Sequence, residues 1–170
     1  ITADNATSWL DRGASHVIVT SYVFHGGQVD EQRLTALSRA VGRERLVLDL
    51  SCRWRGDGYY VVTDRWQKFT KLKIEPAALA WLAGYCDEFL VHAVDVEGKC
   101  MGIDARLLAL LAASVTIPAT YAGGVASQAD LDLLLAAGKG CIDFTVGSAL
   151  DIFGGKGLSY RAVADSYGRA

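Results

Sequence analysis

Apolar and polar positions alternate between two kinds of segment along the whole chain. Continuous apolar runs predict buried strands at residues 16–21, 45–51, 88–94, 117–124 and 142–148. Apolar residues at helical spacing predict helices over residues 4–13, 30–42, 75–85, 104–114, 127–138 and 159–168. Strands that are apolar on both faces are typical of parallel sheets covered by helices. The fold class is therefore α/β, either a doubly wound sheet or a (β/α)8 barrel.

Capping residues mark the ends of several predicted helices. The N-caps are Asp4 and Asp30, the stops are Gly13 and Gly42, and Pro76 occupies a first turn. Residues 53–67 predict a hairpin insertion that turns at 56–58, and residues 150–155 predict a short turn. Because no low-complexity linker interrupts the pattern, we expect residues 1–170 to form one domain.

An internal repeat favours the barrel over the open sheet. Residues 1–21 and 125–148 share one order: a polar start, a helix, a glycine (Gly13 or Gly138), a strand, a small residue and a serine. Two similar βα units could match by chance, but this match extends through helix, loop and strand. In a barrel built from two similar halves, such units lie on opposite sides of the mouth. The repeat therefore predicts a ligand with two similar ends.

Composition excludes several classes of protein. The chain has 170 residues, a net charge of −2 and 51% hydrophobic residues, which suits one domain with a sizeable core. No basic face suggests nucleic acid as a partner, and no apolar run approaches the roughly 18 residues of a membrane span. We see no export signal and expect the protein not to be secreted. The cysteines, which show no metal or redox spacing, are expected to be buried reduced thiols: Cys52, Cys86, Cys100 and Cys141.

Glycine and serine at two successive strand ends predict a phosphate-binding site. Gly123 and Gly124 end one strand directly before a helix, and Gly147 and Ser148 end the next. Glycine exposes backbone N–H groups, and the loops after the last two strands of barrels commonly hold a phosphate. The alternative is two tight turns that need glycine for geometry alone. The repeat places Thr20 and Ser21 in a second phosphate cradle.

Asp49 is the main candidate for catalysis. It lies late in an otherwise aliphatic strand, where a carboxylate is costly unless it faces the barrel mouth. Partial burial beside an anionic ligand would raise its pKa, as suits a general acid. The alternative is a carboxylate paired with a neighbouring arginine or with the backbone.

Other candidates lie in the loops above the same strand ends. Arg53, Arg65 and Trp66 in the hairpin could stack on a flat heterocycle, although the tryptophan could instead pack back on the barrel. His92 lies at a strand end, where a structural imidazole is the commoner case. The loop that contains Glu97 and Gly98 could reach ligand hydroxyls.

Several segments together resemble a known family. They are HVIVTSYVF, LVLDLSCR, VVTDRWQKFT, EFLVHAVDVEGK, TYAGGV and VGSALDIFGG. These segments are similar to the isomerase of histidine biosynthesis, phosphoribosylformimino-aminoimidazole carboxamide ribotide isomerase (the HisA type), in its plant and algal branch. The resemblance implies a (β/α)8 barrel without cofactor or metal, in the cytoplasm or plastid stroma and monomeric at full length. It also implies a bisphosphorylated substrate and an Amadori rearrangement in which Asp49 is the general acid.

The resemblance also marks what this sequence leaves out. It implies that residues 1–170 carry strands four to eight, and that strands one to three and the catalytic base precede Ile1. We therefore expect these residues alone to be inactive, with an open sheet edge at residues 16–20. Ala93 stands where bacterial relatives tend to carry a threonine. The alternatives are the sister cyclase of the pathway and a non-catalytic phosphosugar-binding fragment.

Overall fold

A computed structural model describes residues 1–168 and shows an α/β fold around a parallel sheet. The sheet order is β1-β4-β8-β9-β10, and every neighbouring pair is parallel. The strands are β1 (Val17–Val19), β4 (Leu46–Asp49), β8 (Glu88–His92), β9 (Ala119–Ala122) and β10 (Ile142–Thr145). Strands that follow one another in the sheet in their chain order are the arrangement of a (β/α)8 barrel, because a doubly wound sheet reverses its order. The predicted α/β class and barrel order are confirmed.

The register aligns the carboxyl ends of neighbouring strands. Leu48 pairs with Phe89, Phe89 with Ala119, and Ala119 with Ile142. Three residues further along the same strands, toward the carboxyl edge, His92 pairs with Ala122, which in turn pairs with Thr145. The loops that follow these strands therefore meet at a single edge. This edge carries most of the candidate residues.

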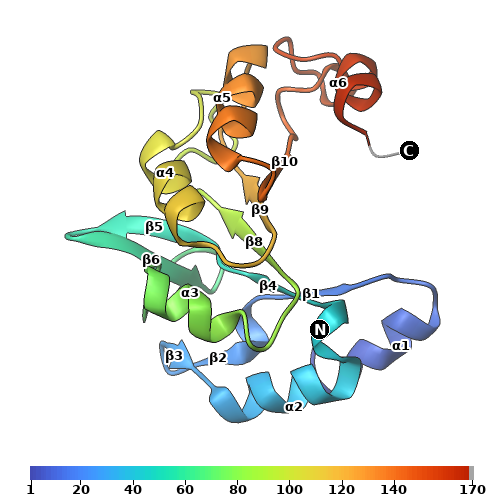
Figure 1. Cartoon of the computed structure of the whole chain (residues 1–170), viewed down its shortest axis with the longest axis vertical. Coiled ribbons are helices and arrows are strands. Elements are labelled where there is room, and N and C mark those ends of the chain that lie inside the picture. The colour runs from blue at the N-terminus through green and yellow to red at the C-terminus, as the bar shows by residue number, and fades with distance from the viewer. Residues whose placement is uncertain (169–170) are drawn as a thin grey trace.

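Helices follow the sheet from one end to the other (Figure 1). They are α1 (Ala6–Asp11), α2 (Glu31–Val41), α3 (Pro76–Leu82), α4 (Ala105–Ser114), α5 (Gln128–Gly138) and α6 (Tyr160–Tyr167). Short 3-10 helices are η1 (Ser21–Val23), η2 (Arg43–Arg45) and η3 (Asp151–Phe153). The predicted roles of Asp30, Gly42 and Pro76 are confirmed. The N-cap predicted at Asp4 is wrong: Asn5 is the N-cap of α1.

The structure contains two small antiparallel sheets in addition to the parallel sheet. The insertion after β4 consists of β5 (Cys52–Arg55), β6 (Gly58–Thr63) and β7 (Lys68–Lys73). The predicted hairpin is confirmed, but its third strand was missed because KFTKLK carries three lysines. A second hairpin joins β2 (Phe24–His25) to β3 (Gln28–Val29) through two glycines with positive φ. Strands of two residues are too short for any periodicity to show.

The core lies between the outer face of the sheet and the helices. Leucines from α2, α3, α4 and α5 pack there against residues of the strands, and the largest fully buried side chains include Tyr121 and Phe89. Helices that follow one another also pack together, α3 against α4 and α4 against α5. Cys52 and Cys86 are buried as expected, but Cys100 and Cys141 are exposed, so that expectation is wrong for two of four thiols. None of the helices among residues 1–168 is long and apolar enough to cross a membrane.

Candidate functional site

Asp49 lies at the carboxyl end of β4, where three hydrogen-bond donors and one imidazole surround its carboxylate. Oδ1 accepts hydrogen bonds from the backbone N–H of Ser51 at 2.8 Å and from its hydroxyl at 2.7 Å. Oδ2 accepts from the Thr20 hydroxyl at 3.3 Å. His92 Nδ1, at the end of β8, lies 3.7 Å from Oδ1 and forms an ion pair when protonated. The sequence predicts either a ligand-facing acid or a carboxylate paired with an arginine or the backbone. The structure shows a carboxylate paired with backbone, hydroxyl and imidazole groups.

The two members of this pair titrate in opposite directions. Burial alone would raise the pKa of Asp49, but the contacts with His92 and Ser51 outweigh it and hold that pKa below its usual 3.8. The carboxylate raises the pKa of His92 above its usual 6.5, against the opposing effect of burial. The pKa of Asp49 is thus lowered, and the raised pKa expected beside an anionic ligand stays a prediction. Burial is the largest single cause and acts in the predicted direction, but the hydrogen bonds and the charge of His92 together reverse the sign.

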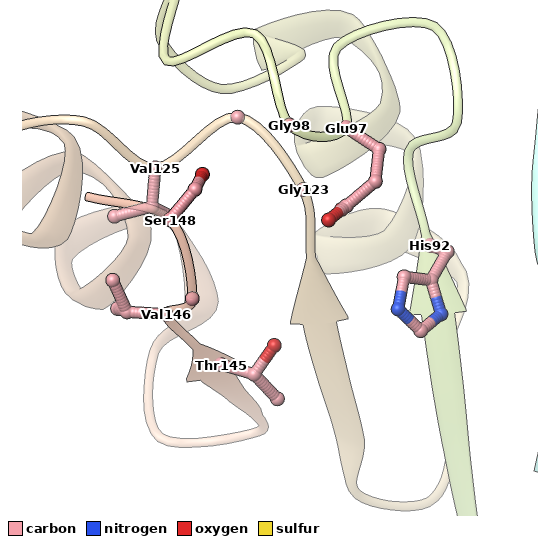
Figure 2. Close-up of a pocket in the computed structure, with 10 residues that line it drawn as sticks. His92, Glu97, Gly98, Gly123, Val125, Thr145, Val146 and Ser148 are labelled. Atoms are coloured by element: carbon pink, nitrogen blue, oxygen red, sulfur yellow. The ribbon is translucent and has the colours of Figure 1, made fainter. Parts of the chain in front are cut away.

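His92 also borders a pocket of about 120 Å³ on the far side of its ring. Figure 2 shows the pocket between the ends of β8, β9 and β10, with the Glu97 side chain directed into it. Five predicted residues join His92 and Glu97 in the lining: Gly98, Gly123, Gly124, Gly147 and Ser148. Val125, Thr145 and Val146 complete it. The structure thus brings both glycine turns and the Glu97 loop together.

The glycines of the two turns are required for different reasons. Gly123 and Gly124 have φ of +115° and +75°, and a side chain at either would crowd backbone atoms of Ala93 or Gly102. At these two positions the tight-turn interpretation explains the glycine. Gly147 has neither constraint: its φ is not positive, and a Cβ there would meet nothing within 4 Å. The fold alone does not explain this glycine, whereas a ligand approaching the backbone would.

Backbone donors at the pocket are unused. Among residues 1–168, the N–H groups of Gly124, Val125, Gly147 and Ser148 donate no hydrogen bond to a protein acceptor. They belong to loops that lie directly before α5 and η3. Unused N–H groups that border a small pocket are suited to an anion such as phosphate.

Thr20 and Ser21 lie at the opposite end of the sheet, at the end of β1. The order of the elements around them agrees with the predicted repeat, because α1, β1 and η1 follow one another as α5, β10 and η3 do. Neither residue lines the glycine pocket. The Thr20 side chain instead donates to Asp49. The second phosphate cradle therefore stays a prediction.

The predicted stacking residues of the insertion separate into two groups. Arg53 donates to Asp95 at 2.8 Å and lies over the Phe69 ring, so it is held between the insertion and the loop after β8. Trp66 approaches the site, with its ring centroid 6.1 Å from that of His92. Arg65 is exposed in the same turn. Asp64, Arg65 and Trp66 all have positive φ, which is unusual for residues other than glycine.

Sequence reasoning missed Ser51 and Thr145. Ser51 is fully buried and supplies two donors to Asp49, and Thr145 lines the pocket. The spacing Asp-x-Ser directly after a strand could have indicated the first, because an aspartate side chain commonly accepts from the backbone N–H two residues later. Among residues 1–168, no three His, Cys, Asp or Glu side chains gather closely enough to hold a metal ion.

Comparison with known proteins gives one consistent result. Residues 1–156 match the family described as "Histidine biosynthesis protein". A chloroplastic phosphoribosyl-imidazole-carboxamide isomerase from Medicago truncatula is 56% identical over 163 residues, covering 96% of this chain and 52% of the relative. Isomerases of the same description from Yarrowia lipolytica and Saccharomyces cerevisiae are 46% and 42% identical. These two matches cover 94% and 92% of this chain, and 64% and 62% of the length of the respective relative. The chain thus spans between half and two thirds of these relatives.

Proposed function

Because the chain belongs to the histidine biosynthesis protein family, we propose that it supplies one phosphate site and the proton-donating end of an aldose–ketose isomerase. The substrate would be the bisphosphorylated aminoaldose that the names of the relatives imply, and the product its aminoketose. The relatives are called isomerases, which favours this activity over the sister cyclase. The name of the Medicago relative supports a plastid location.

Gly147 is the observation that carries the proposal. It is a glycine that the fold does not require, placed beside unused N–H groups in a pocket that Gly123, Gly124 and Ser148 also line. Phosphate oxygens accept hydrogen bonds from such groups without a cationic side chain. Glu97 would repel a bare phosphate but can accept from sugar hydroxyls. The lining therefore suits a phosphorylated sugar better than inorganic phosphate.

The proton-donating end is the Asp49–His92 pair. In an Amadori rearrangement an acid first protonates the oxygen of the sugar ring, and the C–O bond breaks to leave a Schiff base. A base then removes a proton from the second sugar carbon. The pair lies on β4 and β8, next to the pocket that would hold one phosphate. The position of Asp49 at a carboxyl strand end agrees with where barrel enzymes carry their chemistry.

Conversion of the aminoaldose tests the proposal directly. The full-length protein that carries this sequence should turn the bisphosphorylated aminoaldose into the aminoketose, which is detected by the ¹³C signal of its new carbonyl group. Asp49→Asn should keep binding but reduce turnover by about a hundredfold or more, because it removes both the acid function and the charge of this side chain. Binding without turnover by the wild-type protein would favour a phosphosugar-binding protein instead.

A further inference from the structure

The loop after β8 carries Glu97 and Gly98 to the phosphate pocket. Figure 2 shows the Glu97 side chain directed from this loop into the pocket. The Glu97 backbone N–H donates to the Val94 carbonyl at 3.3 Å, a bond inside the loop itself, and Gly98 is exposed. The position of the Glu97 carboxylate in the pocket therefore depends on where the loop is anchored before and after it.

The later part of the loop is anchored on the glycine turns. The Gly102 N–H donates to the Gly124 carbonyl at 3.1 Å, and the Gly102 carbonyl lies so close that a side chain at Gly124 would overlap it. The Cys100 thiol lies 3.3 Å from the Ser148 hydroxyl. This anchor joins the loop to the two turns that would hold the phosphate.

The earlier part of the loop is anchored on the insertion by Asp95. Its Oδ1 accepts from Nε of Arg53 at 2.8 Å, and its Oδ2 accepts from the backbone N–H of Trp54 at 3.0 Å. Both donors belong to β5, and the Arg53 guanidinium also lies over the Phe69 ring of β7. One carboxylate therefore ties the loop to a side chain and to the main chain of the insertion.

We propose, on the basis of the proposed function, that Asp95 is a positioning residue that holds this loop so that Glu97 meets the sugar of a bound substrate. Asp95 does not line the pocket, so it acts through the loop and not by touching the ligand. The side chains of Asp95 and Arg53 are 38% and 41% exposed, and an ion pair this exposed adds little to stability. Without the anchor, the loop would have to be ordered when the substrate binds, and this ordering costs affinity.

The insertion offers a matched control in the Asp57–Lys73 ion pair. Asp57 Oδ2 lies 2.6 Å from the Lys73 ammonium group, and its Oδ1 accepts from the Tyr60 hydroxyl at 3.0 Å. Asp57 thus has two donors, as Asp95 does, but all three residues belong to the insertion. None of them lines the phosphate pocket. Removing this carboxylate breaks a comparable contact without releasing the loop after β8.

Steady-state kinetics of the full-length protein test the role of Asp95. Asp95→Ala should raise KM for the aminoaldose about tenfold and leave kcat within about threefold, because a contact made in both the ground state and the transition state is weakened. Arg53→Met leaves the Trp54 contact in place and should raise KM by only about threefold. The double variant should match Asp95→Ala alone, because both changes remove one shared contact. Asp57→Ala should leave KM unchanged.

Two measurements that need no turnover complete the test. Asp95→Ala should weaken the affinity for ribose 5-phosphate about tenfold, followed by the amide shifts of Gly147 and Ser148. Asp95→Ala and Asp57→Ala should unfold at the same urea concentration, which separates positioning from a general structural role.

Three results would overturn the proposal. They are a KM in Asp95→Ala within about twofold of wild type, a KM in the double variant equal to the product of the two single effects, and unfolding of Asp95→Ala at a clearly lower urea concentration than Asp57→Ala. Failure of the proposed function is recognised separately, because the wild-type protein would then form no aminoketose. The affinity for ribose 5-phosphate would still decide the role of Asp95.

Discussion

The two ends of the sheet carry the same succession of elements but offer different chemistry. At one end, α1, β1 and η1 lead to Thr20 and Ser21; at the other, α5, β10 and η3 follow with Gly147 and Ser148. Only the second pair lines the pocket that the turn after β9 also borders. At the first end, the Thr20 hydroxyl supports Asp49. One repeat unit therefore lines the candidate phosphate pocket, while the other donates a hydroxyl to the Asp49 carboxylate.

We infer from this difference that a strand end with a small residue and a serine needs a second loop to form the proposed phosphate site. The pocket needs a second loop, and Gly123 and Gly124 of the neighbouring strand supply it. β1 and β10 each pair with one neighbour in the described sheet, β4 and β9 respectively. The expected sheet edge at residues 16–20 is thus present. A second loop on the free side of β1 would be needed to complete a cradle at Thr20 and Ser21.

Gly124→Ala should have the largest effect on the β10 end. The new methyl group would overlap the Gly102 carbonyl oxygen, and alanine is strained at φ +75°. We expect the free energy of unfolding to fall by about 3 kcal/mol in urea denaturation, with loss of phosphate binding. Gly140→Ala is the matched control, because φ is +80° there but no atom lies within 4 Å. Equal losses in the two variants would show that φ strain, and not the close approach, accounts for the glycine.

Gly147→Val should separate binding from folding. Its Cβ has open space, so we expect the unfolding free energy to change by only about 0.5 kcal/mol. The branched side chain would occupy the ligand side of the turn and weaken binding of the bisphosphorylated substrate at least about tenfold, measured by calorimetry. Gly84→Val, at an exposed glycine away from the pocket, should leave the affinity unchanged. Equal losses of stability and affinity in Gly147→Val would instead support a purely structural turn.

The smallest predicted effect is the pH dependence of stability. The raised pKa of His92 gives stabilisation that is complete below its usual 6.5 and is lost as pH rises through the folded-state pKa. The lowered pKa of Asp49 gives stabilisation that is present above 3.8 and is lost as pH falls through its own folded-state pKa. Between these limits the pair stabilises the folded state. Urea denaturation at pH 6 and pH 9 should show this difference in wild type but not in His92→Gln. An equal decline in both proteins would mean that other groups cause it.

The sequence was sufficient for the barrel order because long apolar strands and capped helices carry strong local signals. Asp30, Gly42 and Pro76 each predicted a helix end that the structure confirms. Short elements such as β2 and β3 gave no signal, since two residues cannot show a period. The titration of Asp49 could not be predicted either. Its direction depends on His92, which lies 43 positions later in the chain and on a neighbouring strand.

The sequence was enough to predict which residues lie together at the site, but not which contacts they make. Strand ends in a parallel sheet share an edge, so Gly123, Gly124, Gly147 and Ser148 could be placed together from spacing alone. Which glycine the fold requires depends on carbonyl groups of distant loops, such as those of Ala93 and Gly102. The ion pair of Arg53 with Asp95 likewise joins two loops whose relative position no local pattern encodes.

The most direct test of the phosphate site is a titration of the ¹⁵N-labelled protein with ribose 5-phosphate, followed by amide chemical shifts. The unused N–H groups of Gly124, Gly147 and Ser148 should move together and saturate at one common concentration of the sugar phosphate. The amides of Thr20 and Ser21 should not follow them. Amides of the glycine turns that stay unchanged at a large excess of ribose 5-phosphate, or a response centred on Thr20 and Ser21, would contradict the assignment of the phosphate site to the β10 end.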